Sequence, residues 1–239
     1  MITVVGNLKG GSGKSTVTFN LAVWLAKTKH DVISFDLDPQ ASLMDVAEVR
    51  EEEGWLPKIK VFRAESDPGS LIERHPGEVL VDVGASNLWA MREAVKMADR
   101  ILVPVTPSQA DVWSTQRFLN IVVDTLRGKT PKIVAFINRA DTHASVRESD
   151  ETEEVLASLP GITLLRKRLC QRTAFRRSFS EGRAVFEMGS SGKAAATEFR
   201  QFVKALFGDA TEQRVKRQKP TNTTVIPKST SSISESALR

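Results

Sequence analysis

Between residues 9 and 16 the chain reads Lys9-Gly10-Gly11-Ser12-Gly13-Lys14-Ser15-Thr16. This stretch lies between an apolar run at residues 2–5 and a helical pattern of apolar side chains at 19–25. Glycines let successive backbone N–H groups point at phosphate oxygens, and the N-terminus of the following helix adds positive charge. Lys14 would reach the β- and γ-phosphates, and the Ser15 hydroxyl would bind Mg²⁺ between them. The stretch predicts a strand, a phosphate-binding loop and a helix, with residues 9–16 at the nucleotide.

Short strand-like runs recur along the chain. They lie at 32–35, 59–62, 79–83, 101–105 and 133–137, each separated from the next by a segment able to form a helix. Such alternation predicts a parallel sheet, and apolar runs without strict polar alternation indicate strands covered on both faces. The expected fold class is α/β, a doubly wound, mostly parallel β-sheet with helices on both faces and right-handed crossovers.

The C-terminal part divides into a last helix and a tail. An apolar stripe predicts the helix, which Gly208 would end, and it consists of Phe199, Phe202, Val203, Leu206 and Phe207. Of the last 20 residues, 12 are Ser, Thr, Pro or Asn, so this segment lacks the apolar content to order itself. We expect residues 1–207 to form one nucleotide-binding domain and residues 208–239 a basic, Ser/Thr-rich flexible tail.

Composition excludes several kinds of protein. The only cysteine in 239 residues, Cys170, cannot make an internal disulfide, an iron–sulfur cage or a cysteine-based zinc site. His30, His75 and His143 lie too far apart in sequence to suggest a metal site. No apolar run approaches the ~20 residues of a membrane-spanning helix, and Met1 leads directly into a strand rather than an export signal. We therefore expect a cytoplasmic protein.

Charge is distributed unevenly along the chain. The formal net charge is +5, but residues 160–219 hold 14 Lys or Arg against 5 Asp or Glu, so the rest of the chain is net negative. Such asymmetry is typical of a contact with nucleic acid or an anionic membrane, although a solvated basic face without a partner would give the same pattern.

The phosphate-binding loop departs from the plain G-x-x-x-x-G-K-[ST] pattern. Leu8 occupies the first glycine position, and an additional lysine, Lys9, opens the loop. The sequence Lys9-Gly10-Gly11-x-x-Lys14-Ser15 resembles the deviant Walker A motif of the ParA/MinD family of partition and positioning ATPases, which are P-loop NTPases. This resemblance implies an ATP-dependent homodimer in which Lys9 crosses the interface to the phosphates of the partner's nucleotide.

Two acidic stretches fit the same family. Asp36-Leu37-Asp38-Pro39-Gln40 follows the second strand-like run and resembles the family's Asp-x-Asp-Pro-Gln switch. The resemblance implies that Asp38 orients or deprotonates the attacking water and that Asp36 supports the Mg²⁺ shell, whereas the simpler interpretation is two helix-capping aspartates. Residues 79–84 form an apolar run that ends in a carboxylate and a glycine, Asp82-Val83-Gly84, as a Walker B segment does. Asp82 would therefore bind Mg²⁺ through water.

The base specificity rests on a short segment that ends the sixth strand. Asn138-Arg139 resembles the family's Asn-Arg pair, whose asparagine contacts adenine. Asn138-Arg139-Ala140-Asp141 also looks like a loose guanine signature with arginine in place of lysine. Because the other motifs match ParA-type ATPases, we expect ATP rather than GTP.

The basic region resembles that of short ParA proteins, which bind DNA non-specifically. Arginine's forked donors suit phosphate whatever the base sequence. Our candidate DNA contacts are Arg168, Arg172, Arg176, Arg177, Arg200 and Lys204. The tail patch Arg214, Lys216, Arg217 and Lys219 either lengthens this footprint as a flexible arm or only solubilises the tail.

The resemblance implies a nucleoid-associated ATPase that positions a plasmid, chromosome or carboxysome-like body, with hydrolysis stimulated by a ParB-like or cargo adaptor. The chain starts directly at the first strand, so we expect no N-terminal helix-turn-helix. A MinD-like membrane-cycling ATPase is the alternative, in which the stripe at 199–207 would bind lipid, although such a stripe is more often the last core helix. A metabolic kinase or ligase on this scaffold is the third class.

Overall fold

The computed structural model describes residues 1–28, 30–63, 68–126, 131–143 and 146–208. Its centre is one sheet in the order β3-β2-β4-β1-β5-β6-β7, with β8 paired to the end of β6. All strand pairings within the described residues are parallel, which confirms the expected α/β fold class. The strands are β1 (Ile2–Val5), β2 (Val32–Asp36), β3 (Lys60–Arg63), β4 (Glu78–Asp82), β5 (Arg100–Val105), β6 (Lys132–Ala140), β7 (Ile162–Leu164) and β8 (Leu169–Cys170).

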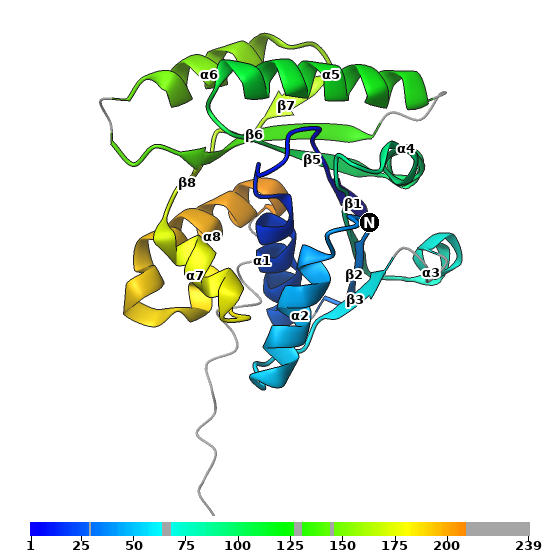
Figure 1. Ribbon diagram of the computed structural model, residues 1–239, viewed down its shortest axis with the longest axis vertical. Coiled ribbons are helices and arrows are strands. Elements are labelled where there is room, and N and C mark those ends of the chain that lie inside the picture. Colours follow the sequence, from blue (N-terminus) through cyan, green and yellow to red (C-terminus); the bar gives the residue numbers. More distant parts are fainter. Residues whose placement is uncertain (29, 64–67, 127–130, 144–145, 209–239) are drawn as a thin grey trace, which may run out of the picture.

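Helices cover both faces of this sheet (Figure 1). One face carries α3 (Pro68–Arg74), α4 (Leu88–Met97), α5 (Gln109–Thr125) and α6 (Glu148–Ser158). The other carries α1 (Lys14–Lys27), α2 (Ser42–Glu52), α7 (Thr173–Ser180) and α8 (Lys193–Phe207), with the short 3-10 turns η2 (Val185–Glu187) and η3 (Gly189–Gly192) between the last two helices. The expected doubly wound architecture is therefore present.

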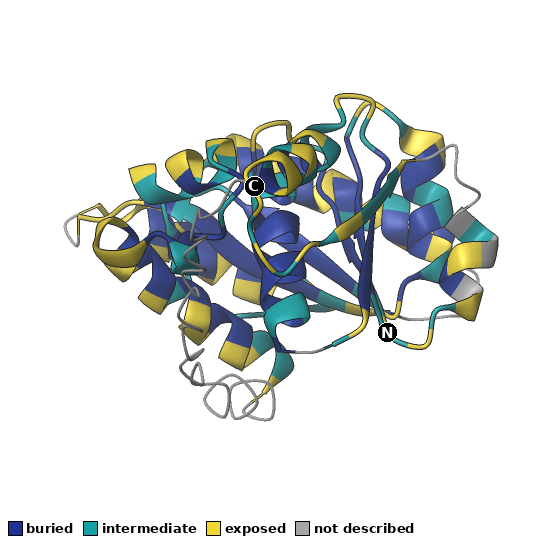
Figure 2. Ribbon diagram, turned by 90° about the horizontal axis from the view of Figure 1, so that it is seen from below, coloured by how far each residue is buried: buried dark blue, intermediate teal, exposed yellow. Residues whose placement is uncertain are grey.

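Successive strand residues feed opposite cores, because side chains alternate across a pleated sheet. In β1, Val4 joins the core under α4 and α5, whereas Val5 joins the core under α1 and α8. Both layers consist of buried apolar side chains, and Figure 2 shows the buried strands between helices whose exposed residues lie on their outer faces. The sheet is thus the rigid platform from whose strand ends the loops project.

Helix α8 completes the second core. Phe199 and Phe202 are fully buried, and the ring of Phe202 lies 4.6 Å from that of Phe136 in β6. The predicted apolar stripe is therefore a core face, which leaves it unavailable to lipid in the folded chain. Helix α8 ends at Phe207, before Gly208 with a φ of 80°, as the sequence predicts. The tail segment 209–239 and its basic patch lie outside the described residues.

The end of the sheet is partly as expected. Strand β6 runs to Ala140, so Asn138 and Arg139 lie at the end of the strand, where the sequence placed them. The extension exists because β8 pairs with this end, with Asn138 opposite Leu169. Strands β7 and β8, three and two residues long, were not predicted.

Among the helices of the described residues, none combines the length and the apolar character that a membrane span requires.

Candidate nucleotide site

The glycine-rich loop lies between β1 and α1 at the carboxyl edge of the sheet. Gly11 and Gly13 have φ values of 76° and 86°, in the left-handed region that L-residues with a Cβ avoid. Gly13 is also the N-cap of α1, and a Cβ there would lie closer than 3.0 Å to the Asn138 side-chain nitrogen. The loop therefore needs glycine at this position both for its backbone conformation and for space.

Lys14 is held inside the loop. Its side chain is 7% exposed, and its Nζ donates to the Lys9 carbonyl at 3.2 Å. Burial lowers the pKa of the Lys14 ammonium, while the charges of Asp82 and Asp38 oppose that shift. An ammonium has three donors, so the bond to Lys9 leaves capacity for phosphate oxygens. A desolvated cation beside orphan helix N–H groups is what a triphosphate would neutralise.

Asn138 and Arg139 brace the loop backbone. The Asn138 amide donates to the Ser12 carbonyl at 2.6 Å, and Arg139 Nη1 donates to the Gly11 carbonyl at 2.5 Å. Arg139 holds a φ of 59°, an uncommon backbone for a residue other than glycine. The sequence-based role of Asn138 as a base contact stays a prediction, and in this structure its amide is turned to the loop.

Asp82 ends β4 beside the loop, and its carboxylate is 1% exposed. Burial raises its pKa to about 7, the Ser15 hydroxyl lowers it, and the neighbouring Asp36 raises it further. Neither carboxylate oxygen has a hydrogen-bond donor in good geometry within the described residues. A buried carboxylate left without donors is costly unless a cation compensates it, so Asp82 and Ser15 fit a Mg²⁺ ion.

Asp36 lies directly opposite Asp82 in the β2–β4 register, yet its oxygens are already used. They accept from the backbone N–H groups of Leu43 and Met44, at 2.9 and 3.0 Å, and from that of Asp38 at 3.1 Å. Burial raises the pKa of Asp36, and these three bonds oppose the shift. Asp36 thus fastens the N-terminus of α2, which is the simpler of its two sequence interpretations; a contribution to a metal shell stays a prediction.

Asp38 lies at the mouth of the site. Its Oδ1 accepts the Gln40 N–H at 3.0 Å, and a Cβ at Gly84 would come closer than 3.0 Å to its carboxylate. Asp38 is half-buried and lines the same cavity as Lys14 and Ser15. Its role in orienting the attacking water stays a prediction.

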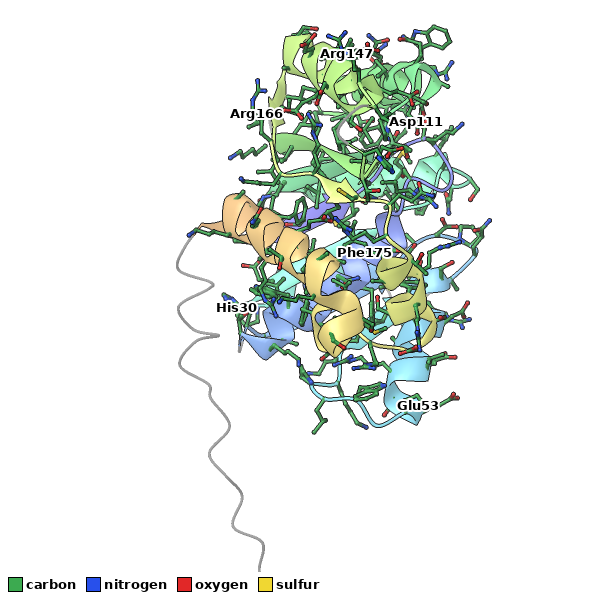
Figure 3. The ribbon with its side chains drawn as sticks, turned by 90° about the vertical axis from the view of Figure 1, so that its left-hand side faces the viewer. His30, Glu53, Asp111, Arg147, Arg166 and Phe175 are labelled. Atoms are coloured by element: carbon green, nitrogen blue, oxygen red, sulfur yellow. The ribbon has the colours of Figure 1, made fainter. Side chains whose placement is uncertain are left out.

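The cavity itself holds about 430 Å³, within the range of small-ligand sites. The phosphate-binding loop forms one wall, and the segment from β8 into α7 forms another, which the sequence did not identify as part of this site. Figure 3 shows Phe175 on α7 in this part of the molecule. The second wall consists of Leu169, Cys170, Gln171, Arg172, Phe175, Arg176 and Phe179. The only sequence signal was the mixture of aromatic and arginine residues at 172–179, because the strand that precedes them, β8, was not predicted.

The six candidate DNA contacts divide by their partners. Arg168 pairs with Asp150 at 2.7 Å and with Glu153, both on α6. Arg172 pairs with Glu198 at 2.6 Å and Arg177 with Glu181 at 2.7 Å. The other three candidates, Arg176, Arg200 and Lys204, are exposed, and within the described residues no ion pair joins Arg176 or Arg200 to an acid.

Lys9 projects from the loop as an exposed residue. Its backbone N–H donates to Asn7 at 3.4 Å and its carbonyl accepts from Lys14, so the backbone is anchored while the ammonium forms no ion pair within the described residues. Residues Gly10, Gly11, Gly13, Lys14, Ser15 and Thr16 all line the cavity, whereas Ser12 is buried behind it. The loop residues predicted from the sequence are therefore brought together.

Comparison with known proteins gives a consistent result. A model of the CobQ/CobB/MinD/ParA nucleotide-binding domain matches residues 3–185. The chain is 27% identical over 209 residues to the maintenance of carboxysome distribution protein A of Halothiobacillus neapolitanus, covering 85% of this chain and 94% of that protein. It is 28% identical over 222 residues to the protein ParA of Rhizobium radiobacter, covering 88% and 98% of the two.

Solved structures agree on the fold. The MinD cell division protein of Aquifex aeolicus superposes with a TM-score of 0.68 at 18% identity, covering 87% of this chain and 97% of that one. A putative plasmid partition protein of Borrelia burgdorferi, bound to AMPPNP, gives 0.67 at 16% identity, covering 86% and 97%. Apo McdA of Cyanothece gives 0.65 at 18% identity, covering 86% and 98%.

Proposed function

Because the chain belongs to the CobQ/CobB/MinD/ParA nucleotide-binding family, we propose that it is a ParA-type partition or positioning ATPase. ATP closes a homodimer, the dimer binds nucleoid DNA without sequence preference, and an adaptor on the cargo stimulates hydrolysis and release. The observation that supports the proposal is the shared wall of the cavity: α7 lines the same cavity as the phosphate-binding loop and carries two exposed arginines, Arg176 at the cavity and Arg177 beside it.

The proposed reaction, ATP and water to ADP and phosphate, needs positioning more than covalent chemistry. Lys14 and the N-terminus of α1 hold the β- and γ-phosphates, and Asp38 orients the attacking water and accepts its proton. Mg²⁺, held through Ser15 and Asp82, would neutralise charge on the phosphate oxygens. Lys9 supplies the remaining positive charge from the partner subunit, which makes rapid hydrolysis depend on dimerisation.

The proposed DNA surface consists of residues of α7 and α8. Arg176, Arg177, Arg200 and Lys204 are exposed there, and two subunits joined around ATP would place two such surfaces side by side. Arg168 and Arg172 must exchange their carboxylate partners for phosphates if they contribute. Each phosphate neutralised should add about one unit to the slope of log affinity against log salt.

The cargo proposal follows the relatives' names: a plasmid, as for the protein ParA, or a carboxysome-like body, as for the carboxysome distribution protein. The adaptor would be a ParB-like or cargo-bound protein. Burial of the α8 stripe weighs against the membrane-cycling alternative, and we propose that the protein acts in the cytoplasm on nucleoid DNA.

Co-sedimentation tests the proposal. With AMPPNP and Mg²⁺ the full chain should elute as a dimer in size-exclusion chromatography. In co-sedimentation it should pellet with linear duplex DNA, but not with phosphatidylcholine–phosphatidylglycerol vesicles. With ADP it should be monomeric and remain in the supernatant. Sedimentation with the vesicles and not with DNA would replace the proposal by the membrane-cycling one.

A further inference from the structure

Helix α7 belongs to two sites at once. Phe175, Arg176 and Phe179 line the nucleotide cavity, and Arg177 on the same helix is exposed to solvent. The helix is only eight residues long, and a 3-10 turn, η2, follows it after four residues. So short an element owes its orientation to what it is fastened to rather than to its own stability.

The fastening is a buried ion pair between α2 and η2. Arg50, in the last turn of α2, is 1% exposed and donates to both Glu187 carboxylate oxygens, at 2.8 and 3.1 Å. The same guanidinium donates to the Gly182 carbonyl at 2.9 Å and to the Pro57 carbonyl at 2.9 Å. Glu187 in turn accepts the Lys27 ammonium at 2.8 Å, so three segments meet at one carboxylate.

Backbone groups between α7 and η2 also contact this ion pair. Glu187 Oε2 accepts the Ala184 N–H at 2.8 Å, and Gly182 packs so closely on α2 that a Cβ there would come within 3.0 Å of the Arg50 backbone. Gly182 and Ala184 lie in the segment that joins α7 to η2. The pair therefore fixes the exit of α7 against the last turn of α2.

The opposite end of α2 is fastened to the switch. Asp36 accepts the Leu43 and Met44 N–H groups at the start of α2, next to Asp38. Eleven helical residues span about 16 Å, so α2 is a rod between the switch aspartates and Arg50. Helix α1, which begins at the phosphate-binding loop, makes a parallel link: Asn20 accepts the Val185 N–H at 2.8 Å.

We infer that Glu187 is a positioning residue that, through Arg50, sets the orientation of α7 relative to the switch helix α2. A buried ion pair contributes little net stability, because desolvation offsets the attraction, so its orienting effect is what distinguishes it from an apolar contact. One orientation of α7 serves both the cavity wall and the basic surface. The expected effect on DNA binding rests on the proposed function, whereas the expected effect on nucleotide binding does not.

The test compares two carboxylates of the same region in the full chain. Glu187→Gln keeps the shape of the buried group and removes its charge, whereas the control Glu181→Gln removes a carboxylate that pairs with Arg177 and Arg183 nearer the surface. The dissociation constant of a fluorescent ATP analogue is measured with Mg²⁺ and without DNA. We expect Glu187→Gln to weaken binding about 5- to 10-fold, at the lower end of typical coupling between sites, and Glu181→Gln to change it less than about 2-fold.

A second measurement needs no variant. In the unaltered protein, AMPPNP with Mg²⁺ should slow hydrogen exchange of the Ala184 and Val185 amides, whose acceptors are Glu187 and Asn20, by at least about 10-fold. Equal nucleotide affinities of the two Gln variants, or unchanged exchange at these amides, would overturn the inference; a lower melting temperature with unchanged affinity is what a merely structural role predicts. If the unaltered protein fails to bind DNA while both nucleotide effects appear, the positioning role stands and the DNA proposal fails.

Discussion

Replacing Gly13 by alanine should damage the empty protein, before any nucleotide is bound. The left-handed backbone at Gly13 costs a residue with a Cβ about 1 kcal/mol or more. The new Cβ would also displace the Asn138 amide, and loss of its bond to the buried Ser12 carbonyl adds about 1 to 2 kcal/mol. We expect the free energy of unfolding to fall by about 3 kcal/mol.

Gly10→Ala is the matched control. No atom lies within 4 Å of a Cβ built at Gly10, and its backbone is not left-handed, so its effect should stay below about 0.5 kcal/mol. The assay is urea denaturation without nucleotide, where 3 kcal/mol shifts the midpoint by about 1.5 M for a slope of about 2 kcal/mol/M.

The steric origin has its own check. If displacement of Asn138 causes the loss, Gly13→Ala in an Asn138→Ala background should cost at least about 1 kcal/mol less than in the natural chain, since contacting residues are non-additive. Equal midpoints for Gly13→Ala and Gly10→Ala would refute the reasoning, because they would show that Asn138 is not held against the loop.

The remaining predictions concern hydrolysis, DNA and pH. Asp38→Ala should bind ATP and stay dimeric on DNA while phosphate release falls at least about 100-fold, in the usual range for losing a catalytic base; normal turnover would remove Asp38 from the mechanism. Gly84→Ala should push the Asp38 carboxylate aside, so phosphate release should fall while the dissociation constant for AMPPNP changes less than about 3-fold. Arg200→Glu with Lys204→Glu should lower the salt slope of DNA retention by about two units, and an unchanged slope would locate the contacts elsewhere. Burial would raise the pKa of Glu187, but Arg50, Lys27 and the Ala184 N–H hold it below its usual value. The ionised carboxylate therefore stabilises the fold fully above about pH 4.5, and this stabilisation is lost as pH falls through the folded pKa. The melting temperature of Glu187→Gln should lack this decline in acid.

Most of the fold follows from short-range patterns. The strand-like runs predict β1 to β6: most of these strands are buried on both faces and leave a compact apolar signature, and the edge strand β3 keeps a short apolar centre at Val61 and Phe62. Strands β7 and β8 leave no such signature, since three and two residues cannot be distinguished from loop, and their pairing with β6 is a long-range choice. The strand-end position of Asn138 and Arg139 was predicted, whereas the pairing of this end with β8 was not.

The site shows the same division. The order of motifs predicts which side chains gather at the carboxyl edge, because parallel strands end there together. It does not predict which way each side chain points. Asn138 faces the loop backbone, and Asp36 accepts a hydrogen bond from the start of α2. Arg50 is the clearest miss, because in Val49-Arg50-Glu51-Glu52 it reads as part of a solvated helix face, whereas its carboxylate partner is 137 residues away.

The strand order has a consequence for when the protein becomes able to bind nucleotide during its synthesis. Strands β1 and β2 do not pair with each other; β4, which ends at residue 82, lies between them. A nascent chain that has emerged only through α2 therefore holds the phosphate-binding loop and the switch on two unjoined strands. Asn138 and α7 emerge still later. We therefore expect the nucleotide site to form late in translation, so ATP can stabilise only a chain in which β4 has already joined β1 to β2.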